Sequence, residues 1–334
     1  MNIALIILVI ALIALGLVEA FLRIRYGLGN PPLYLADART GYRLKPNQRL
    51  KRLGNQIEVN QFSMRGPAIS PQRPDDTLRV LLLGDSIING GWWTDQSDIL
   101  SALLQTQLAS ALSQQFGRVE VLNASANSWG PRNQLGYVAR FGLFESQIVL
   151  VVLNTDDLFA IAPTSVQVGR DRSYPRRKPL LAIFEAIGRV QTPRPLTELE
   201  ALQEQESGDR VGSNLEAIRQ IKLRSEENYS RLILTMTPLR RELEDDGPRD
   251  YELIARQRLL TFTQREQIPY LDFLPIFQQN PDFAALYRDH IHLSPQGNQL
   301  VTLQLAQFVQ TALMTSAPAF LPAPLDDTGE DLWQ

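Results

Sequence analysis

The chain has 334 residues, of which 44% are hydrophobic and 21% charged, and its formal net charge is -3 at pH 7. This composition is that of a globular protein with ample core, and the absence of a concentrated run of lysine and arginine gives no electrostatic footprint for nucleic acid. There is no cysteine and there are only two histidines, which excludes disulfides, thiolate catalysis and sulfur-ligated zinc and argues against a histidine-rich metal site. We therefore expect a functional site without metal or cofactor.

An apolar run at the N-terminus predicts a single membrane anchor, to which we assign residues 1–25. Residues 3–22 are almost entirely apolar apart from Glu19, and Arg23 and Arg25 close the run. About twenty such residues are what a helix needs to span a bilayer. Because no basic residues precede the run and no good small-x-small cleavage site follows it, an uncleaved anchor is favoured over a removed signal peptide.

Residues 26–56 are predicted to be a juxtamembrane linker. The stretch from Gly27 to about Pro46 is interrupted by proline and glycine, and Asn30-Pro31-Pro32 forms a stiff spacer within it. Such punctuation is typical of connecting segments, so we expect periodic structure to begin near residue 57.

Strand and helix patterns alternate over residues 57–314, which we take as one domain. After a weaker alternation at 57–62, short apolar runs suited to buried strands lie at 78–83, 119–122, 148–153, 232–236 and 270–273. Helical patterns lie between and after them, at 99–116, 132–144, 215–227, 251–266 and 295–313. This alternation predicts a three-layer α/β/α sandwich around a five-stranded parallel sheet.

One segment, residues 161–211, breaks this rhythm. It carries clustered prolines, basic runs at 170–172 and 176–178, and an acidic stretch at 198–206. Because it is too long for a plain connection, we expect an insertion above the carboxyl ends of the strands, where substrate specificity usually lies. We interpret its charged runs as solvated faces. Residues 315–334, with several prolines and acidic residues near the end, are predicted to be a flexible tail.

A candidate nucleophile, Ser86, follows the first of the buried strands. The run 78–83 leads into Gly84-Asp85-Ser86, so this turn falls at the carboxyl end of a parallel strand, where open α/β sheets bind their ligands. A serine hydroxyl needs a neighbouring imidazole to take its proton and a carboxylate to orient that imidazole. The two histidines of the chain lie together in Asp289-His290-Ile291-His292, so the imidazole must come from there.

His292 is the favoured base and Asp289 the favoured orienting acid. In a tight loop a carboxylate three residues upstream can reach the ring nitrogen and fix its tautomer. His290 is the competing base, but a strand-like path would turn the two rings to opposite sides, so that only one of them faces Ser86. Asp272 is the alternative acid, although an aspartate that closes a strand is more often a turn or cap residue.

These motifs resemble the SGNH (GDSL) hydrolase superfamily in its membrane-anchored bacterial form. The nucleophile of that family lies in a Gly-Asp-Ser turn after the first strand, and its acid and base come from an Asp-x-x-His motif before the last helix. Here these are Gly84-Asp85-Ser86 and Asp289 to His292. Residues 60–66 also resemble the Asn-x-x-x-x-Arg-Gly segment that often precedes the nucleophile strand. The resemblance extends from about Ile57 to Val309 and implies the flavodoxin-like SGNH hydrolase fold.

The resemblance also implies an oxyanion hole, and here the chain departs from the family pattern. Besides the backbone N–H of Ser86, members supply a glycine N–H where this chain has Ser128, and an asparagine amide where it has Asp156. An ionised aspartate would repel a developing oxyanion, and a lost donor raises the barrier by roughly 2.7 to 4 kcal/mol. Either Asn154 donates instead, or Asp156 is protonated, or the activity is reduced. We favour Asn154, whose competing role is to cap the strand end.

Three tryptophans, Trp92, Trp93 and Trp129, flank these loops. Core packing is the default role of tryptophan. Trp92 and Trp93 follow the nucleophile turn closely, so an acyl or sugar pocket lined by these two rings is the alternative interpretation.

The leading hypothesis is a membrane-anchored serine esterase or O-acyltransferase that acts on an acyl ester through an acyl-enzyme. The resemblance implies acylated glycans or lipids as substrates and an extracytoplasmic, periplasmic catalytic domain, although Arg23 and Arg25 favour a cytoplasmic one by the charge rule. The alternative is a weakly active or non-catalytic module of this fold that binds polysaccharide or an assembly partner, which Asp156 and the charged insertion suggest. A nucleotide-binding α/β protein ranks last, because the chain lacks a phosphate-binding glycine loop.

Overall fold

A parallel sheet of five strands forms the centre of the fold. The computed structural model describes residues 3–192 and 195–315, and within them this sheet has the strand order β6-β5-β7-β8-β9. Its strands are β5 (Thr77–Gly84), β6 (Arg118–Ser125), β7 (Ile148–Asn154), β8 (Arg231–Thr237) and β9 (Tyr270–Asp272). Every neighbouring pair is parallel. The five predicted central strands are confirmed.

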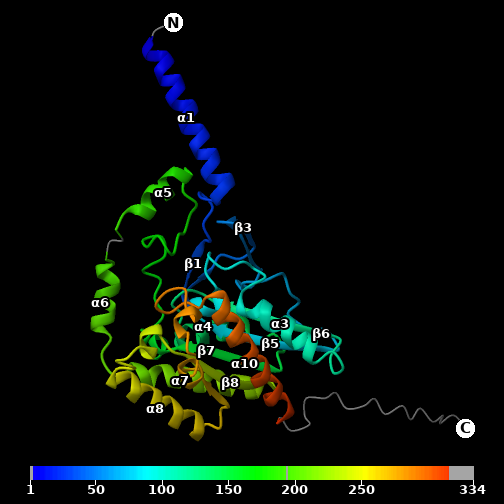
Figure 1. Cartoon of the computed structure of the whole chain (residues 1–334). Helices are drawn as coiled ribbons and strands as arrows, with labels where there is room; N and C mark the ends of the chain where they lie inside the picture. The colour runs from blue at the N-terminus through cyan, green and yellow to red at the C-terminus, as the bar shows by residue number, and fades with distance from the viewer. Residues whose placement is uncertain (1–2, 193–194, 316–334) are drawn as a thin grey trace, which may run out of the picture.

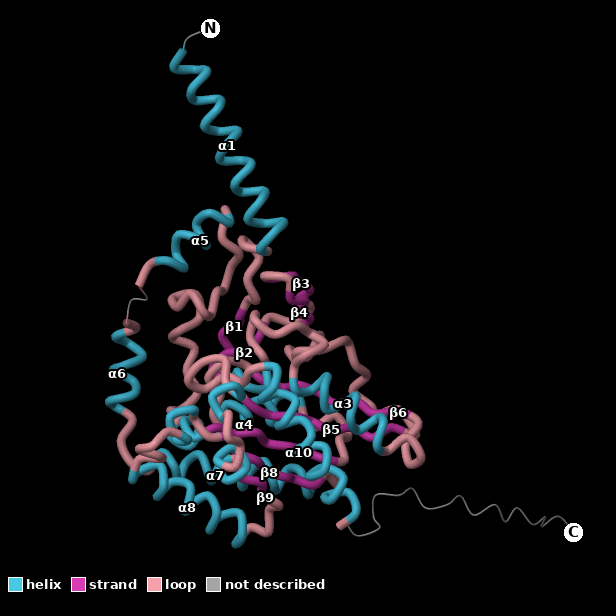
Figure 2. The backbone as a smooth tube through the Cα atoms, viewed as in Figure 1, coloured by secondary structure: helices cyan, strands magenta, loops and turns pink. Residues whose placement is uncertain are grey.

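Helices cover both faces of the sheet and make the three layers seen in Figures 1 and 2. Val80 and Leu82 of β5 belong to one core and Leu81 and Leu83 to the other, because successive side chains of a strand point to opposite faces. The first core is closed by α2 (Ser86–Asn89), α3 (Leu100–Ala111), α9 (Leu274–Gln278) and α10 (Pro295–Met314). The second is closed by α4 (Pro131–Phe141), α7 (Arg210–Glu227) and α8 (Asp250–Arg265). The predicted three-layer architecture is thereby confirmed.

The segment predicted as a linker, residues 26–56, is instead folded into β-structure. Two antiparallel hairpins lie between α1 and the sheet (Figure 2), made of β1 (Tyr34–Asp37) with β2 (Gly41–Leu44) and β3 (Gln48–Arg52) with β4 (Asn55–Val59). The weak alternation noted from residue 57 belongs to β4, which pairs with β3 and lies outside the central sheet. Leu53 and Gly54 form the tight turn between β3 and β4, and both have positive φ, at 48° and 94°, as a two-residue hairpin turn requires.

Apolar side chains of these hairpins are part of the main core. Tyr42, Ile57 and Val59 are each less than 5% exposed and belong to the same cluster as the residues of α4 and α7. Residues ahead of position 57 therefore share a core with the predicted domain 57–314.

At the N-terminus, α1 (Ile3–Tyr26) projects away from the body of the molecule (Figure 1). Within the described ranges it is the one helix long and apolar enough to cross a membrane, a property that it shares with signal sequences. None of its described residues is buried.

The insertion, residues 161–211, contains α5 (Ala182–Val190) and α6 (Thr197–Gln205) and runs into α7. α5 contacts the end of α1 nearest the body. The 3-10 helices η1 (Thr155–Phe159), η2 (Arg240–Leu243) and η3 (Phe283–Leu286) lie in other connections. The predicted tail 315–334 lies, apart from Thr315, outside the described residues.

Candidate active site

Ser86 lies at the first residue of α2, directly after the carboxyl end of β5. Asp85 caps this short helix, since its carboxylate accepts a hydrogen bond from the N–H of Ile87 at 2.9 Å. A side chain at Gly84 would collide with Ile88 and approach the carbonyl of Val152. A glycine is therefore needed for the turn that brings the serine out of the sheet.

The loop before α10 brings His292 to Ser86. The ring Nε2 of His292 lies 2.9 Å from the Ser86 Oγ, and the ring Nδ1 lies 2.8 Å from an Asp289 carboxylate oxygen. The other carboxylate oxygen of Asp289 accepts the backbone N–H groups of Ile291 and His292, at 3.0 and 2.8 Å. If Nδ1 carries the ring proton toward Asp289, Nε2 is left to accept the hydroxyl proton of Ser86.

The Asp289 carboxyl is held in its ionised form. Partial burial works to raise its pKa, but the backbone N–H groups of His292 and Ile291 and the His292 ring outweigh burial. The pKa of Asp289 therefore lies below its ordinary value, so this group carries negative charge at neutral pH.

The competing base and acid point elsewhere. The His290 side chain is 81% exposed, and its ring lies 3.8 Å from Asp289 at the nearest atoms. Both carboxylate oxygens of Asp272 accept hydrogen bonds from one Arg256 nitrogen, at 3.0 and 3.2 Å, and one of them also accepts the N–H of Leu274. Within the described residues, His292 is thus the imidazole that meets Ser86, and Asp272 binds Arg256 and the first residue of α9.

Asn154 lies at the carboxyl end of β7 and is committed to hydrogen bonds. Its amide nitrogen donates to Asp85 at 2.9 Å, and its amide oxygen accepts the N–H of Asp156 at 2.8 Å, which caps η1. Since Asp85 is the neighbour of Ser86, the amide lies close to the serine. An amide nitrogen has two N–H groups, so one remains after the bond to Asp85.

Ser128 occupies the position where a glycine was expected and has a glycine-like backbone. Its φ is 56°, in the left-handed region that favours glycine, and its hydroxyl accepts a hydrogen bond from the Tyr174 hydroxyl at 2.9 Å. Ser128 therefore holds a left-handed backbone conformation that costs a non-glycine residue about 1–2 kcal/mol.

Asp156 lines the same cavity as Ser86. Burial raises the pKa of its carboxyl, Arg241 opposes this, and Glu252 and Glu242 raise it further. A raised pKa weakens the charge that this residue would direct at an oxyanion.

Two further carboxyls lie buried beneath the serine. Burial raises the pKa of both Asp85 and Asp157, and for Asp157 the neighbouring Asp85 adds to the effect. Asp157 accepts the backbone N–H of Asn154 at 3.0 Å. Asp157 was not among the site residues predicted from sequence, although two consecutive aspartates after a buried strand were a visible signal.

Arg65, in the segment that resembles the family's Asn-x-x-x-x-Arg-Gly motif, fixes the loop after α2. It is only 2% exposed, and its guanidinium donates to the carbonyls of Asn89 and Thr94 at 2.5 Å each and to the carbonyl of Gly91. These carbonyls bracket Trp92 and Trp93, so the arginine positions the tryptophan loop against the site. The sequence alone did not reveal this role.

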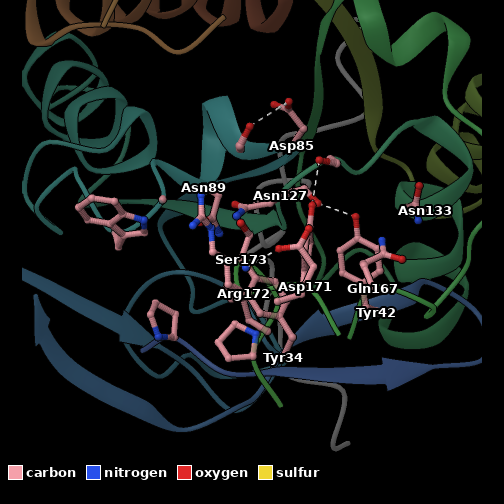
Figure 3. Close-up of a pocket in the computed structure, with 18 of the residues that line it drawn as sticks. Tyr34, Tyr42, Asp85, Asn89, Asn127, Asn133, Gln167, Asp171, Arg172 and Ser173 are labelled. Carbon is pink, nitrogen blue, oxygen red and sulfur yellow. Dashed lines mark hydrogen bonds between the residues drawn. The ribbon is translucent and has the colours of Figure 1, made fainter. Parts of the chain in front are cut away.

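A cavity of about 1140 Å³ opens beside Ser86 and His292. In Figure 3, Tyr34 and Tyr42 from the β1–β2 hairpin and Gln167 from the insertion lie on one side of this cavity, and Asp85 lies on another. The segment predicted as an insertion thus supplies much of the wall at the carboxyl ends of the strands.

Two of the three tryptophans line the cavity, and the third is buried in the core. Trp92 and Trp93 line the cavity, and the Trp93 ring packs edge-on against the His292 ring at 4.6 Å between centroids. Trp129 is buried and donates its ring N–H to the Tyr42 carbonyl at 2.9 Å. Among the described residues, no group of three or more His, Asp or Glu side chains could hold a metal ion.

The chain matches the model of the GDSL-like Lipase/Acylhydrolase family over residues 82–300. No curated protein matches it. One similar solved structure is LAE5, an alpha/beta hydrolase enzyme from the metagenome of Lake Arreo, Spain, with 14% identity and a TM-score of 0.47 over 72% of this chain and 97% of that chain. A second is the acetyl xylan esterase AlAXEase, with 12% identity and a TM-score of 0.44 over 71% of this chain and 100% of that chain. A third is a lipase/acylhydrolase from Enterococcus faecalis, with 14% identity and a TM-score of 0.43 over 70% of this chain and 96% of that chain.

Proposed function

Because the chain belongs to the GDSL-like lipase/acylhydrolase family, whose members hydrolyse ester bonds, we propose that Ser86, His292 and Asp289 form its catalytic triad. The observation that supports this most is the continuous hydrogen-bonded line from the Ser86 hydroxyl to the His292 ring at 2.9 Å and on to the Asp289 carboxylate at 2.8 Å. This is the arrangement in which a serine becomes a nucleophile at neutral pH.

In the first half of the reaction the Ser86 Oγ bonds to the carbonyl carbon of an acyl ester while His292 Nε2 takes the hydroxyl proton. The carbonyl becomes a tetrahedral oxyanion, and Asp289 stabilises the imidazolium. Collapse of this intermediate breaks the ester C–O bond, and His292 gives its proton to the leaving alcohol. The acyl group then remains on Ser86.

In the second half, water or another hydroxyl group attacks the acyl-enzyme. His292 takes the proton of the attacking group and returns it to Ser86, which frees the acid or the transferred ester. Hydrolysis and acyl transfer share this intermediate, so O-acyl transfer is part of the same proposal. Acylated glycans and lipids are the substrate classes that we propose.

For the oxyanion hole we propose the backbone N–H groups of Ser86 and Ser128 with the second amide N–H of Asn154. The left-handed φ of Ser128 and the short path from Asn154 through Asp85 to the serine support this set. Asp156 is the alternative donor only in its protonated form, which its raised pKa makes easier to reach.

We also propose that α1 anchors the protein and that the catalytic domain is extracytoplasmic. The length and composition of α1 support the anchor. A tag fused after Gln334 tests the side: protease applied to intact spheroplasts should remove it, and protection of the tag would place the domain in the cytoplasm.

A fluorophosphonate probe tests the nucleophile directly, because it bonds only to an activated serine. The full chain should be labelled, Ser86→Ala should not, and Ser113→Ala, which removes an exposed hydroxyl near the end of α3, should be labelled as the parent is. If the folded parent is not labelled at all, the protein is the non-catalytic binding module that Asp156 and the charged insertion otherwise suggest.

A further inference from the structure

α5 presents its apolar side to solvent and its polar side to the protein. Phe184, Ile187 and Val190 of α5 are all exposed, Val190 at 87%, and their spacing of three residues puts them on one stripe. Leu180, two residues before the helix, is also 87% exposed. On the opposite side Glu185 accepts the N–H of Gly29 at 2.6 Å and pairs with Arg52 of β3. A helix on the surface of a soluble domain has the reverse orientation, with the apolar stripe toward the core.

α5 is also held at a defined level on α1. The two carboxylate oxygens of Glu19 accept the first N–H groups of α5, from Ala182 at 2.8 Å and Ile183 at 3.1 Å. Arg23, one turn further along α1, donates to the carbonyl of Leu180 at 2.9 Å. Figure 1 shows α5 beside the end of α1 that meets the body.

This level is where α1 would leave a bilayer. Residues 3–22 of the helix extend over about 30 Å at 1.5 Å per residue, which matches the hydrocarbon thickness. Glu19 and Arg23 then lie at the boundary between acyl chains and headgroups, and α5 begins at the same height.

Basic residues precede the exposed apolar stripe. Arg176, Arg177 and Lys178 are exposed and lie immediately before Leu180, and Arg189 is exposed at the far end of α5. Apolar residues on one face with lysine and arginine beside them are typical of helices that lie in a membrane interface, and an anionic surface attracts basic residues near it.

We propose that α5 docks on the surface of the bilayer that α1 crosses, with its apolar stripe at the boundary of the acyl chains and Arg176 to Lys178 against anionic headgroups. The inference rests on the proposed anchor. Because Phe184 and Gly188 of α5 also line the cavity that holds Ser86, docking brings one wall of the active-site cavity against the membrane. The basic run 176–178 is then a lipid contact rather than a solvated face.

The absence of cysteine allows a direct test with the full chain, because a single introduced cysteine carries a fluorophore at one chosen place. We compare Ile187→Cys on α5 with Tyr229→Cys, an exposed residue in the turn before β8, at the amino ends of the sheet strands. Each protein is reconstituted in vesicles of phosphatidylcholine and phosphatidylglycerol. Docking predicts several-fold stronger quenching at position 187 by a lipid with a nitroxide near its headgroup, and several-fold weaker quenching by aqueous iodide, than at position 229. Equal quenching at the two positions would overturn the proposal.

Two companion measurements separate the causes of a negative result. A fluorophore at Leu12→Cys in the middle of α1 should be shielded from iodide; if it is shielded while position 187 is not, the anchor stands and docking fails. If both are open to iodide, docking fails together with the anchor. Fluorophosphonate labelling of the same vesicles reports on Ser86 independently of either.

The role of charge is tested by replacing Arg176, Arg177 and Lys178 together with glutamine in the Ile187→Cys protein. The parent should lose lipid quenching at position 187 when phosphatidylglycerol is omitted, and the triple variant should have the same weaker quenching in both kinds of vesicle. If the triple variant keeps the full dependence on phosphatidylglycerol, the basic run does not bind the headgroups.

Discussion

Replacing Asp289 by asparagine should disable the site while leaving its shape nearly intact. One oxygen of this carboxylate accepts the backbone N–H groups of Ile291 and His292 and lies 3.1 Å from His292 Nδ1, and the other oxygen lies nearer to Nδ1, at 2.8 Å. An asparagine oxygen can keep both backbone bonds. Its NH₂ group then faces Nδ1, which must become an acceptor, so the ring proton moves to Nε2 and the ring can no longer take the proton of Ser86.

The two expected effects of Asp289→Asn differ in size. Hydrogen bonds to a charged acceptor contribute about 1.5–3 kcal/mol and neutral ones about 0.5–1.5 kcal/mol, so two weakened bonds lower the free energy of unfolding by about 2–3 kcal/mol. Exposure of 40% of the Asp289 side chain puts the loss at the lower end. The wrong tautomer lowers the reaction rate on the order of 1,000- to 10,000-fold, or about 4–5.4 kcal/mol of barrier.

The assay measures the rate of fluorophosphonate labelling of Ser86 together with unfolding in urea. Asp272→Asn is the matched control, because Asp272 binds Arg256 and the N–H of Leu274. It should lose stability but be labelled at the parental rate. Labelling of Asp289→Asn within about tenfold of the parent would refute the view that this carboxylate fixes the His292 tautomer.

Three further predictions concern stability and follow from the contacts around the site. Ser128→Gly should be about 1 kcal/mol more stable than Ser128→Ala in urea unfolding, because both lose the hydroxyl and only glycine relaxes the φ of 56°; equal stabilities would contradict this. Arg65→Lys should lower the free energy of unfolding by at least about 1.5–3 kcal/mol, since one ammonium cannot serve carbonyls that two guanidinium nitrogens bind, whereas Arg49→Lys on the exposed face of β3 should be almost neutral. Asp157→Asn should flatten the pH dependence of stability. The pKa of Asp157 is raised in the folded state, so its stabilising contribution is full below the unfolded value of about 3.9 and is lost, at about 1.4 kcal/mol per pH unit, as the pH rises toward the folded value. The free energy of unfolding should therefore fall more steeply between about pH 5 and about pH 8 in the parent than in the variant. If this free energy has the same pH dependence in both proteins, Asp157 is not the group responsible.

The sheet could be predicted from sequence because its strands are nearly continuous apolar runs. Leu78 to Leu83 and Ile148 to Leu153 are buried on both faces, so no polar alternation obscures them. The family could be predicted because Gly84-Asp85-Ser86 stands at the end of one such run, and the family match confirms it. Ser86 and His292 were candidates for a shared site because the chain offers its two histidines in one place.

The hairpins could not be predicted in the same way. Their strands have four or five residues, and the side chains that bury themselves, such as Tyr42 and Ile57, are separated by charged ones. Their stability comes from packing on α4 and α7, which a local pattern does not record. Contacts between distant segments were equally hidden: Asn154 reaches Asp85 across 69 positions, and Arg65 reaches the loop after α2.

The hairpins have a practical consequence for any shortened version of this protein. A fragment made of residues 82–300, the span that matches the family, would lack the aromatic and branched side chains that β2 and β4 pack into the core with α4. It would also lack Arg65, whose guanidinium holds the tryptophan loop. Such a fragment would keep Ser86 and His292 but would have cavities in its hydrophobic core. A truncation that removes α1 and keeps the buried side chains must end at Tyr26, because Leu28 and Leu33 are buried, and it separates α5 from Glu19, which accepts the first N–H groups of α5.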